Sequence, residues 1–472
     1  MIGTMPVAAC EGGLIQPTAS DARPLGARHT EELASFVIES VWSDLPAPVQ
    51  HEAARAFLNW VGCAHGGAFH SAVEQALPAL KALSGSQACT VIGRGVRLDP
   101  LSAALLNGLS VGAHAFDDAH VETVVHPAAP TVAALLAYAE QHRVSGSDFL
   151  HALMISHEVQ CRLSCALAVG PAACHVGHYM TGLTGAIGVA TGVGKLMGLS
   201  AKQLVWAMGI AAMQGGGFRS SHGTMSAAFI PGNAGRSGLL AAHLAANDFT
   251  CHAEPLSSPN GLLSVVGRPS YPEALTERLG QHWECMNVAI KPFPNGCLIH
   301  AATDVCLELA RLHSFSRGDI ERVEIQVHEL SLALTGKDEP KDSYEAQVSL
   351  HHWAAAALYY GRADLNEASD ACVRDPAIIA LRRRIFASVA SDLRPDEARA
   401  SIVLQSGQRL EAQVSPHIGS AKRPLSDEQL EAKFLSQAQD HLGTERTRHL
   451  IALCWRLPLA LDVGRAAPGF WG

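Results

Sequence analysis

The densest group of titratable side chains lies in the segment GAHAFDDAHVETVVHP, residues 112–127. It contains three histidines and three carboxylates: His114, Asp117, Asp118, His120, Glu122 and His126. Apolar helical patterns precede and follow it, so we expect a loop between buried helices. A histidine beside a carboxylate suits general acid–base catalysis, because its pKa can be tuned around neutral pH. The segment is a candidate active-site loop, although a solvated loop whose aspartates cap helix ends would have a similar composition.

Two further groups of polar residues stand beside glycine-rich segments. His178 and Tyr179 come just before the glycine-rich segment 181–198, and the N–H groups at the start of a helix there would attract an anion. Arg219 and His222 follow three successive glycines. No GKS or GKT ends that glycine run, so it is not a phosphate-binding P-loop. The alternative for both groups is helix capping and aromatic packing.

A fourth group lies in KPFPNGCLIHAATD, which begins at Lys291. The proline after Lys291 restricts the backbone and therefore limits where its ammonium can reach. Cys297 and His300 would make a nucleophilic pair if they met, but the local sequence matches no cysteine-hydrolase signature. A buried, unreactive thiol is the simpler interpretation of Cys297.

A metal centre is the main alternative for the first segment, since His114, Asp118 and His120 offer nitrogen and oxygen ligands. Their spacing matches no specific metal motif, and the twelve cysteines include no CxxC pair. We therefore expect neither a metal nor any other cofactor in the active site.

Composition excludes several classes of function. The 472 residues carry a formal charge of −9 without a cluster of lysines or arginines, so a nucleic-acid partner is not expected. Hydrophobic residues make up 48%, enough for a large core. The apolar segment 181–198 is barely long enough to span a membrane, and its glycines instead favour close helix packing in a water-soluble protein. We expect a cytoplasmic protein with reduced thiols.

Hydrophobic periodicity predicts a mainly α protein, with a smaller α+β unit inserted between helical segments. Residues 1–28 are expected to form a flexible arm. Helical patterns fill 29–284, whereas 285–420 contains strand-like alternation and a hairpin with a Ser406-Gly407 turn. The segment 421–472 returns to helix and is expected to pack back on the helical domain.

Five motifs in order resemble the MmgE/PrpD family, which includes 2-methylcitrate dehydratase, cis-aconitate decarboxylase and iminodisuccinate epimerase. They are LNGLSVGAHAFDDAH with the later HP, SHEVQCRL, GHYMTGLTGAIGVATG, GTMSAAFIPGNAGRSG and KPFPNGCLIHAATD, and the likeness covers about residues 30–440. The resemblance implies a large all-helical domain built from both chain ends and a smaller, inserted α+β lid domain. It further implies a homodimer and a cofactor-free active site between the two domains. It also implies a reaction that moves a proton next to a carboxylate of a small organic acid.

Several family positions are retained. His126, followed by proline, matches the family's site histidine, while Lys291 and His300 match the residues that open and close its KxYPxCxxxH stretch. Asp117 and Asp118 match the second half of its DFDD motif. The resemblance therefore implies catalytic roles for His126 and Lys291, with a substrate-binding role for His300 and the aspartates.

Other family positions are replaced. Ala115 stands for the first aspartate of DFDD, and Ala119 for the Thr or Ser after it. The histidine of the usual HP falls at Tyr179, or at His178 with a one-residue shift. Three further replacements are Ala227 for a lysine, Ile230 for a histidine and Cys297 for an arginine.

The replaced lysine and arginine would each hold a substrate carboxylate, and such a charge-assisted contact contributes roughly 1.5–3 kcal/mol. We therefore expect a lyase or isomerase acting on an organic acid less anionic than a tricarboxylate, with His126 and Lys291 joined by Tyr179 or His178 in catalysis. The remaining candidates for substrate binding are His114, His120, Arg219, His222 and Cys297. The alternatives are an inactive member that serves as a scaffold and a metal-dependent hydratase.

Overall fold

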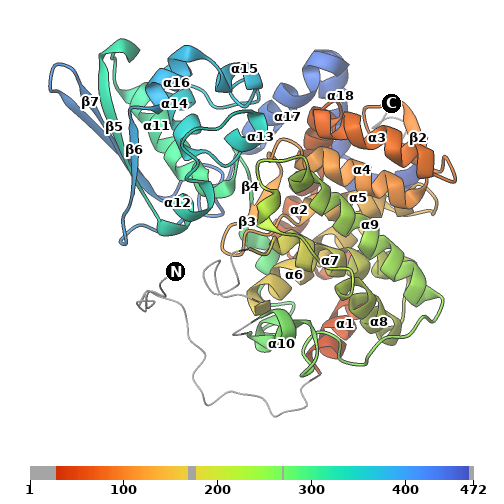
Figure 1. Ribbon diagram of the computed structural model, residues 1–472. Coiled ribbons are helices and arrows are strands. Elements are labelled where there is room, and N and C mark those ends of the chain that lie inside the picture. The colour runs from red at the N-terminus through yellow and green to blue at the C-terminus, as the bar shows by residue number, and fades with distance from the viewer. Residues whose placement is uncertain (1–27, 168–176, 268–269, 467–472) are drawn as a thin grey trace.

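The computed structural model describes residues 28–167, 177–267 and 270–466, and its fold is mainly α-helical with a smaller α/β part, as predicted (Figure 1). Apart from Arg28, the predicted N-terminal arm lies outside the described residues. The elements of the helical part are α1 (His29–Glu39), α2 (Ala47–Gly67), α3 (Ser71–Leu83), β1 (Cys89–Val91), β2 (Val96–Leu98), α4 (Pro100–Gly112), α5 (Ala128–Ala139), α6 (Gly146–Leu167), α7 (Met180–Met197), α8 (Ala201–Ala212), α9 (Ser226–Ala246), α10 (Leu262–Val266), α17 (Asp427–Leu442) and α18 (Thr444–Trp455).

Small residues let the helices of this part approach closely. A Cβ placed on Gly238 of α9 would lie 2.4 Å from the carbonyl oxygen of Ala186 in α7. One placed on Gly188 of α7 would lie 2.3 Å from a side-chain carbon of Gln160 in α6. The glycines of segment 181–198 therefore serve helix packing. Within the described residues, no helix combines the length and the hydropathy needed to cross a membrane.

The α/β part has a hydrophobic core of its own, which includes Trp353 and the inward side chains of a four-stranded sheet. The strand order is β6-β5-β7-β8, with β5 and β6 parallel and the other pairs antiparallel. Its helices lie on the side of the sheet that faces the helical part (Figure 1). The elements are α11 (His300–Leu312), β5 (Ile320–Val327), α12 (Glu329–Thr335), α13 (Ser343–Ala346), α14 (Leu350–Tyr360), α15 (Asp370–Val373), α16 (Pro376–Arg382), β6 (Ile385–Val389), β7 (Ala398–Leu404) and β8 (Arg409–Val414).

Side-chain caps and a turn glycine fix several element ends. Asp99 caps α4, and both Ser200 and Ser426 form capping boxes at the starts of α8 and α17. The predicted hairpin is β7–β8, and Gly407 in its turn has a φ of +82°. Helix α9 begins at Ser226, and Pro231 lies inside it.

The histidine-rich segment 112–127 is not purely the loop that the sequence predicts. It contains the short strand β3 (Asp118–His120), which pairs antiparallel with β4 (Val288–Ile290). Periodicity could not predict this strand, because three residues are too few to show alternation. The β3–β4 pair joins the helical part to the chain that enters the α/β part, directly before Lys291.

Candidate active site

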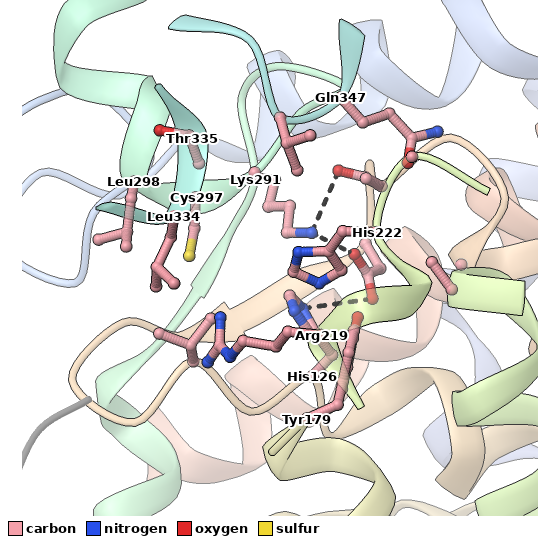
Figure 2. A pocket seen from close by; sticks show the side chains of 18 of the residues that line it. His126, Tyr179, Arg219, His222, Lys291, Cys297, Leu298, Leu334, Thr335 and Gln347 are labelled. Atoms are coloured by element: carbon pink, nitrogen blue, oxygen red, sulfur yellow. Dashed lines mark hydrogen bonds and ion pairs between the residues drawn. The ribbon is translucent and has the colours of Figure 1, made fainter. Parts of the chain in front are cut away.

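A cavity lies between the helical part and the α/β part (Figure 2). Its walls come from segments far apart in the chain. The lining residues are Gly112, Ala115, Asp117, Val124, His126, Tyr179, Arg219, His222, Gly223, Ala227, Pro231, Lys291, Gly296, Cys297, Leu298, Leu334, Thr335, Gln347 and Val348. An apolar lining with a few convergent polar side chains is typical of a small-molecule site.

The carboxylate of Asp117 joins two of the predicted site residues. Lys291 Nζ lies 2.6 Å from Asp117 Oδ1 and 3.1 Å from the carbonyl oxygen of Ala115. His126 Nδ1 lies 3.6 Å from Asp117 Oδ2. Lys291 has three N–H donors, so one remains for a substrate oxygen after these two contacts.

The β3–β4 pair sets the position of Lys291. Asp118 is paired with Ile290, and the backbone N–H of Lys291 continues the ladder by donating to the carbonyl of Asp117 at 3.1 Å. The strand pair therefore brings an ammonium from residue 291 beside a carboxylate from residue 117. Because the lysine side chain is almost fully buried, its ion pair is held away from solvent.

His126 is fixed in both orientation and protonation state. Its backbone N–H donates to Thr181 Oγ1 at 2.8 Å, and Nδ1 lies 2.6 Å from the carbonyl oxygen of Asp118. A carbonyl only accepts, so Nδ1 carries the proton and Nε2 keeps a lone pair. Burial and the charge of Lys291 lower the pKa of His126 to about 4, so the ring is neutral at pH 7. This state is the one required of a general base.

The two neighbouring aspartates differ in charge state. Burial opposes ionisation of Asp117, but the charge of Lys291 outweighs it and lowers its pKa. Burial and the carboxylate of Asp117 raise the pKa of Asp118 to about 8. Asp118 accepts the N–H of Ala128 at the start of α5 and does not line the cavity. The site therefore holds a carboxylate at Asp117 and a neutral carboxyl group behind it.

Tyr179, His222 and Arg219 form the wall beside His126 (Figure 2). The Tyr179 ring centroid is 5.8 Å from that of His126 and 5.5 Å from that of His222. Burial and the charge of Asp117 raise the pKa of Tyr179, so its hydroxyl stays neutral. Burial and the charge of Arg219 lower the pKa of His222 to about 4. The wall therefore offers one guanidinium cation and several neutral proton donors or acceptors.

The opposite wall is apolar. Val124, Cys297 and Leu298 pack together in a small hydrophobic cluster that also contains Ala119 and Leu330. Leu334 packs against this cluster and lines the cavity with it. Burial raises the pKa of the Cys297 thiol, so no thiolate nucleophile is available there.

Five predicted site residues do not line the cavity: His114, Asp118, His120, His178 and His300. The His114 ring packs edge-on against His70, and the His300 ring packs against Phe293 and His417.

His120 contacts Thr123 and Glu284, whereas Asp118 contacts the start of α5. His178 forms a β-bridge with Phe218, and its carbonyl accepts a hydrogen bond from Arg219 Nε at 3.0 Å. The three residues of the suggested metal centre, His114, Asp118 and His120, thus point to different partners.

Sequence reasoning missed the contribution of the α/β part to the cavity. Leu334 and Thr335 come from the end of α12, and Gln347 and Val348 from the turn between α13 and α14. Gln347 Nε2 also donates to the carbonyl oxygen of Ala113 at 2.8 Å. Leucine, threonine, glutamine and valine are not typical catalytic residues. Only the packing of the two parts therefore identifies them as cavity residues.

Comparisons with known proteins agree with this architecture. The sequence model of the MmgE/PrpD N-terminal domain matches residues 31–274, and that of the C-terminal domain matches residues 293–457. The chain belongs to the MmgE/PrpD family. A cis-aconitate decarboxylase-like protein of Aspergillus oryzae is 28% identical over 480 residues, which cover 94% of this chain and 98% of the relative.

More distant family members share most of their length with the chain. The cis-aconitate decarboxylase of Aspergillus terreus is 26% identical over 462 residues, which cover 92% of this chain and 94% of the relative. The human cis-aconitate decarboxylase is 25% identical over 445 residues, which cover 90% of each. At this identity the chain is a divergent member of the family.

The positions at which the chain departs from the family motifs lie in different surroundings. Ala115, Ala227 and Cys297 line the cavity, whereas Ala119 and Ile230 are buried in packing contacts. Ala115 has a φ of +50°, a left-handed conformation that aspartate adopts more readily than alanine. The backbone therefore has a conformation that suits the family's aspartate, but its carboxylate is missing.

Proposed function

We propose that this protein is a lyase or isomerase that needs no cofactor and moves a proton next to a carboxylate or carbonyl of a small organic acid. The observation that carries the proposal is the placement of His126 and Lys291 on the two oxygens of Asp117 in one cavity. Family membership and the decarboxylase relatives support a lyase-type reaction. A base next to a buried cation suits proton abstraction that produces an enolate.

In the proposed reaction, Nε2 of His126 removes the proton next to the carbonyl or carboxylate. The electron pair of that C–H bond moves toward the carbonyl oxygen, where the ammonium of Lys291 stabilises the developing negative charge. Asp117 stabilises the imidazolium that forms, since its Oδ2 faces Nδ1. Tyr179 or His222 then protonates the leaving group in an elimination, or the opposite face of the carbon in an epimerisation.

The cavity favours a substrate with one carboxylate and an apolar substituent. Arg219 supplies a guanidinium for the carboxylate, and the wall around Val124, Leu298 and Leu334 suits an alkyl or other apolar group. Ala227 and Cys297 offer no charge to a second or third carboxylate. Such a substrate is less anionic than cis-aconitate.

The proposal is tested by a screen in deuterated water. It covers small monocarboxylic acids and their 3-hydroxy and 2,3-unsaturated relatives. Proton NMR would detect exchange at the acidic carbon as well as net conversion. Exchange that disappears in His126→Ala supports the proposed reaction. If no acid in the series exchanges or reacts above the His126→Ala background, the inactive scaffold becomes the better interpretation.

We also infer that the protein acts as a homodimer on a small organic acid, as the family resemblance implies, and that it is cytoplasmic. Light scattering coupled to size-exclusion chromatography measures the oligomeric state directly. A mass of one chain, 49.8 kDa, at micromolar concentration would contradict the homodimer.

A further inference from the structure

Three potential metal ligands converge outside the residues that line the cavity. They are His120 in β3, Cys165 near the end of α6, and Glu284, which begins the short 3₁₀ helix Glu284–Asn287. One ligand atom from each residue lies within 4.8 Å of the other two, and His120 Nε2 is 3.0 Å from Glu284 Oε1. Among the described residues, no other three side chains of His, Cys, Asp or Glu bring their ligand atoms this close together.

Neighbouring side chains already hold the ligands in place. Thr123 Oγ1 lies 2.8 Å from Nδ1 of His120, and Asn287 Nδ2 donates to Glu284 Oε1 at 2.9 Å. His282 Nε2 contacts the other oxygen of Glu284 at 2.9 Å. Protein zinc sites commonly fix the second nitrogen of a ligating histidine and the second oxygen of a ligating carboxylate in this way.

The charges around the three residues favour a cation. Besides Glu284, the carboxylates of Glu122 and Glu158 act on the Cys165 thiol, with Arg162 as the opposing cation. Arg162 is already engaged, since its Nε lies 2.5 Å from Glu158 and its other nitrogens donate to backbone carbonyls. A divalent ion would offset the remaining negative charge.

We propose that His120, Cys165 and Glu284 bind a zinc ion, with a water molecule as the fourth ligand. One imidazole nitrogen, one sulfur and one carboxylate oxygen form a ligand set that zinc favours, whereas magnesium and calcium prefer oxygen alone. On binding, the Cys165 thiol releases its proton to solvent and the sulfur bonds to the metal.

The ion would link three segments that position the catalytic groups. His120 lies in β3, Glu284 lies four residues before β4, and Cys165 belongs to α6. Zinc therefore clamps the β3–β4 pair, which carries Asp118 and leads into Lys291, to the helical part. The site is structural, and the proposal is independent of the reaction assigned to the cavity.

Cobalt(II), which replaces zinc and absorbs visible light, tests the site in the full-length, tag-free chain after treatment with a chelator. We expect one equivalent to bind, with the intense visible bands of tetrahedral cobalt and a near-ultraviolet thiolate-to-metal band. Zinc should displace the cobalt and raise the Tm. Cys165→Ala should abolish the thiolate band, and Glu284→Gln should weaken binding roughly tenfold or more.

Cys251→Ala is the matched control, because Cys251 is the other partly exposed cysteine of the described residues and lies away from this group. It should bind cobalt as the unmodified chain does. The proposal is overturned if the unmodified chain shows no thiolate band, or if the band survives Cys165→Ala. Should Cys165→Ala fail to fold by circular dichroism, Glu284→Gln decides: unchanged cobalt affinity and zinc-dependent Tm in that variant contradict the site.

Discussion

His126 and Lys291 stand 165 positions apart in the chain, yet their side chains contact opposite oxygens of Asp117, with Nδ1 to Oδ2 at 3.6 Å and Nζ to Oδ1 at 2.6 Å. The carboxylate therefore couples the proposed base to the proposed electrophile. A proton gained by His126 is stabilised by Asp117, while the ammonium of Lys291 turns its remaining donor toward the cavity.

His126→Ala and Lys291→Met should each lower kcat roughly a hundredfold or more, because each removes a group that acts in the transition state. The assay is turnover of whichever acid the exchange screen identifies, with circular dichroism to verify folding. Lys195→Met is the control, since Lys195 donates to the carbonyls of Ile38 and Ser40 and does not line the cavity. Equal losses in Lys195→Met and Lys291→Met would contradict the assigned role of Lys291.

Replacing Lys291 alone leaves the Asp117 carboxylate buried without its ion-pair partner. The double variant Lys291→Met/Asp117→Asn should therefore be more stable than Lys291→Met by roughly 3 kcal/mol or more, although both lack activity. Urea unfolding measures the difference. Equal stability of the two variants would mean that Asp117 does not carry the buried charge inferred from its contacts.

Cis-aconitate and 2-methylcitrate should be poor substrates, with kcat far below about 10 s⁻¹, because Ala227 and Cys297 provide no cation for their additional carboxylates. Ala227→Lys should lower the KM for cis-aconitate at least tenfold if its ammonium reaches the cavity. Ser226→Lys adds the same charge at the exposed start of α9 and should leave KM unchanged. Rapid turnover of cis-aconitate by the unmodified chain would refute the substrate class proposed above.

Acid should destabilise the fold below pH 6.5. Burial lowers the pKa of His126, His222 and His352 from 6.5 to about 4 in the folded chain. Because the unfolded chain binds these protons first, stability is complete above pH 6.5 and is lost as pH falls toward 4. A histidine shifted this far contributes up to roughly 3 kcal/mol. Thermal unfolding between pH 7.5 and 4.5 measures this loss of stability, and the loss should be smaller in His352→Gln. An unchanged Tm of the unmodified chain over this interval would contradict the prediction.

Lys433→Met should lower activity even though Lys433 is not among the residues that line the cavity. Lys433 is buried in α17, and its Nζ donates at 2.6 Å both to Asn59 Oδ1 and to the carbonyl oxygen of Phe116, the residue before Asp117. Losing this contact should lower kcat about tenfold while KM changes little, because the loop that presents Asp117 loses a fixed point. Lys433→Arg should restore part of the rate. A change in KM alone would argue against a positioning role.

The amino-acid sequence by itself predicted the mainly helical fold, the smaller α/β part and the family, because long amphipathic segments, caps and ordered motifs are local features. It also singled out His126, Lys291, Tyr179, Arg219 and His222, all of which line one cavity. These residues could be singled out because their side chains can transfer protons or bind anions, and because they lie next to breaks in the helical pattern.

Only the tertiary structure decided which of the clustered histidines reach the cavity. His114, His120 and His126 lie within thirteen positions of one another, but His114 packs against His70 just after α4, and His120 contacts Glu284 from strand β3. Likewise, Gln347 and Leu334 join the wall because the α/β part packs against the helical part. Side-chain direction in a short irregular segment depends on distant pairing, here between residues 118–120 and 288–290, and local sequence patterns do not encode it.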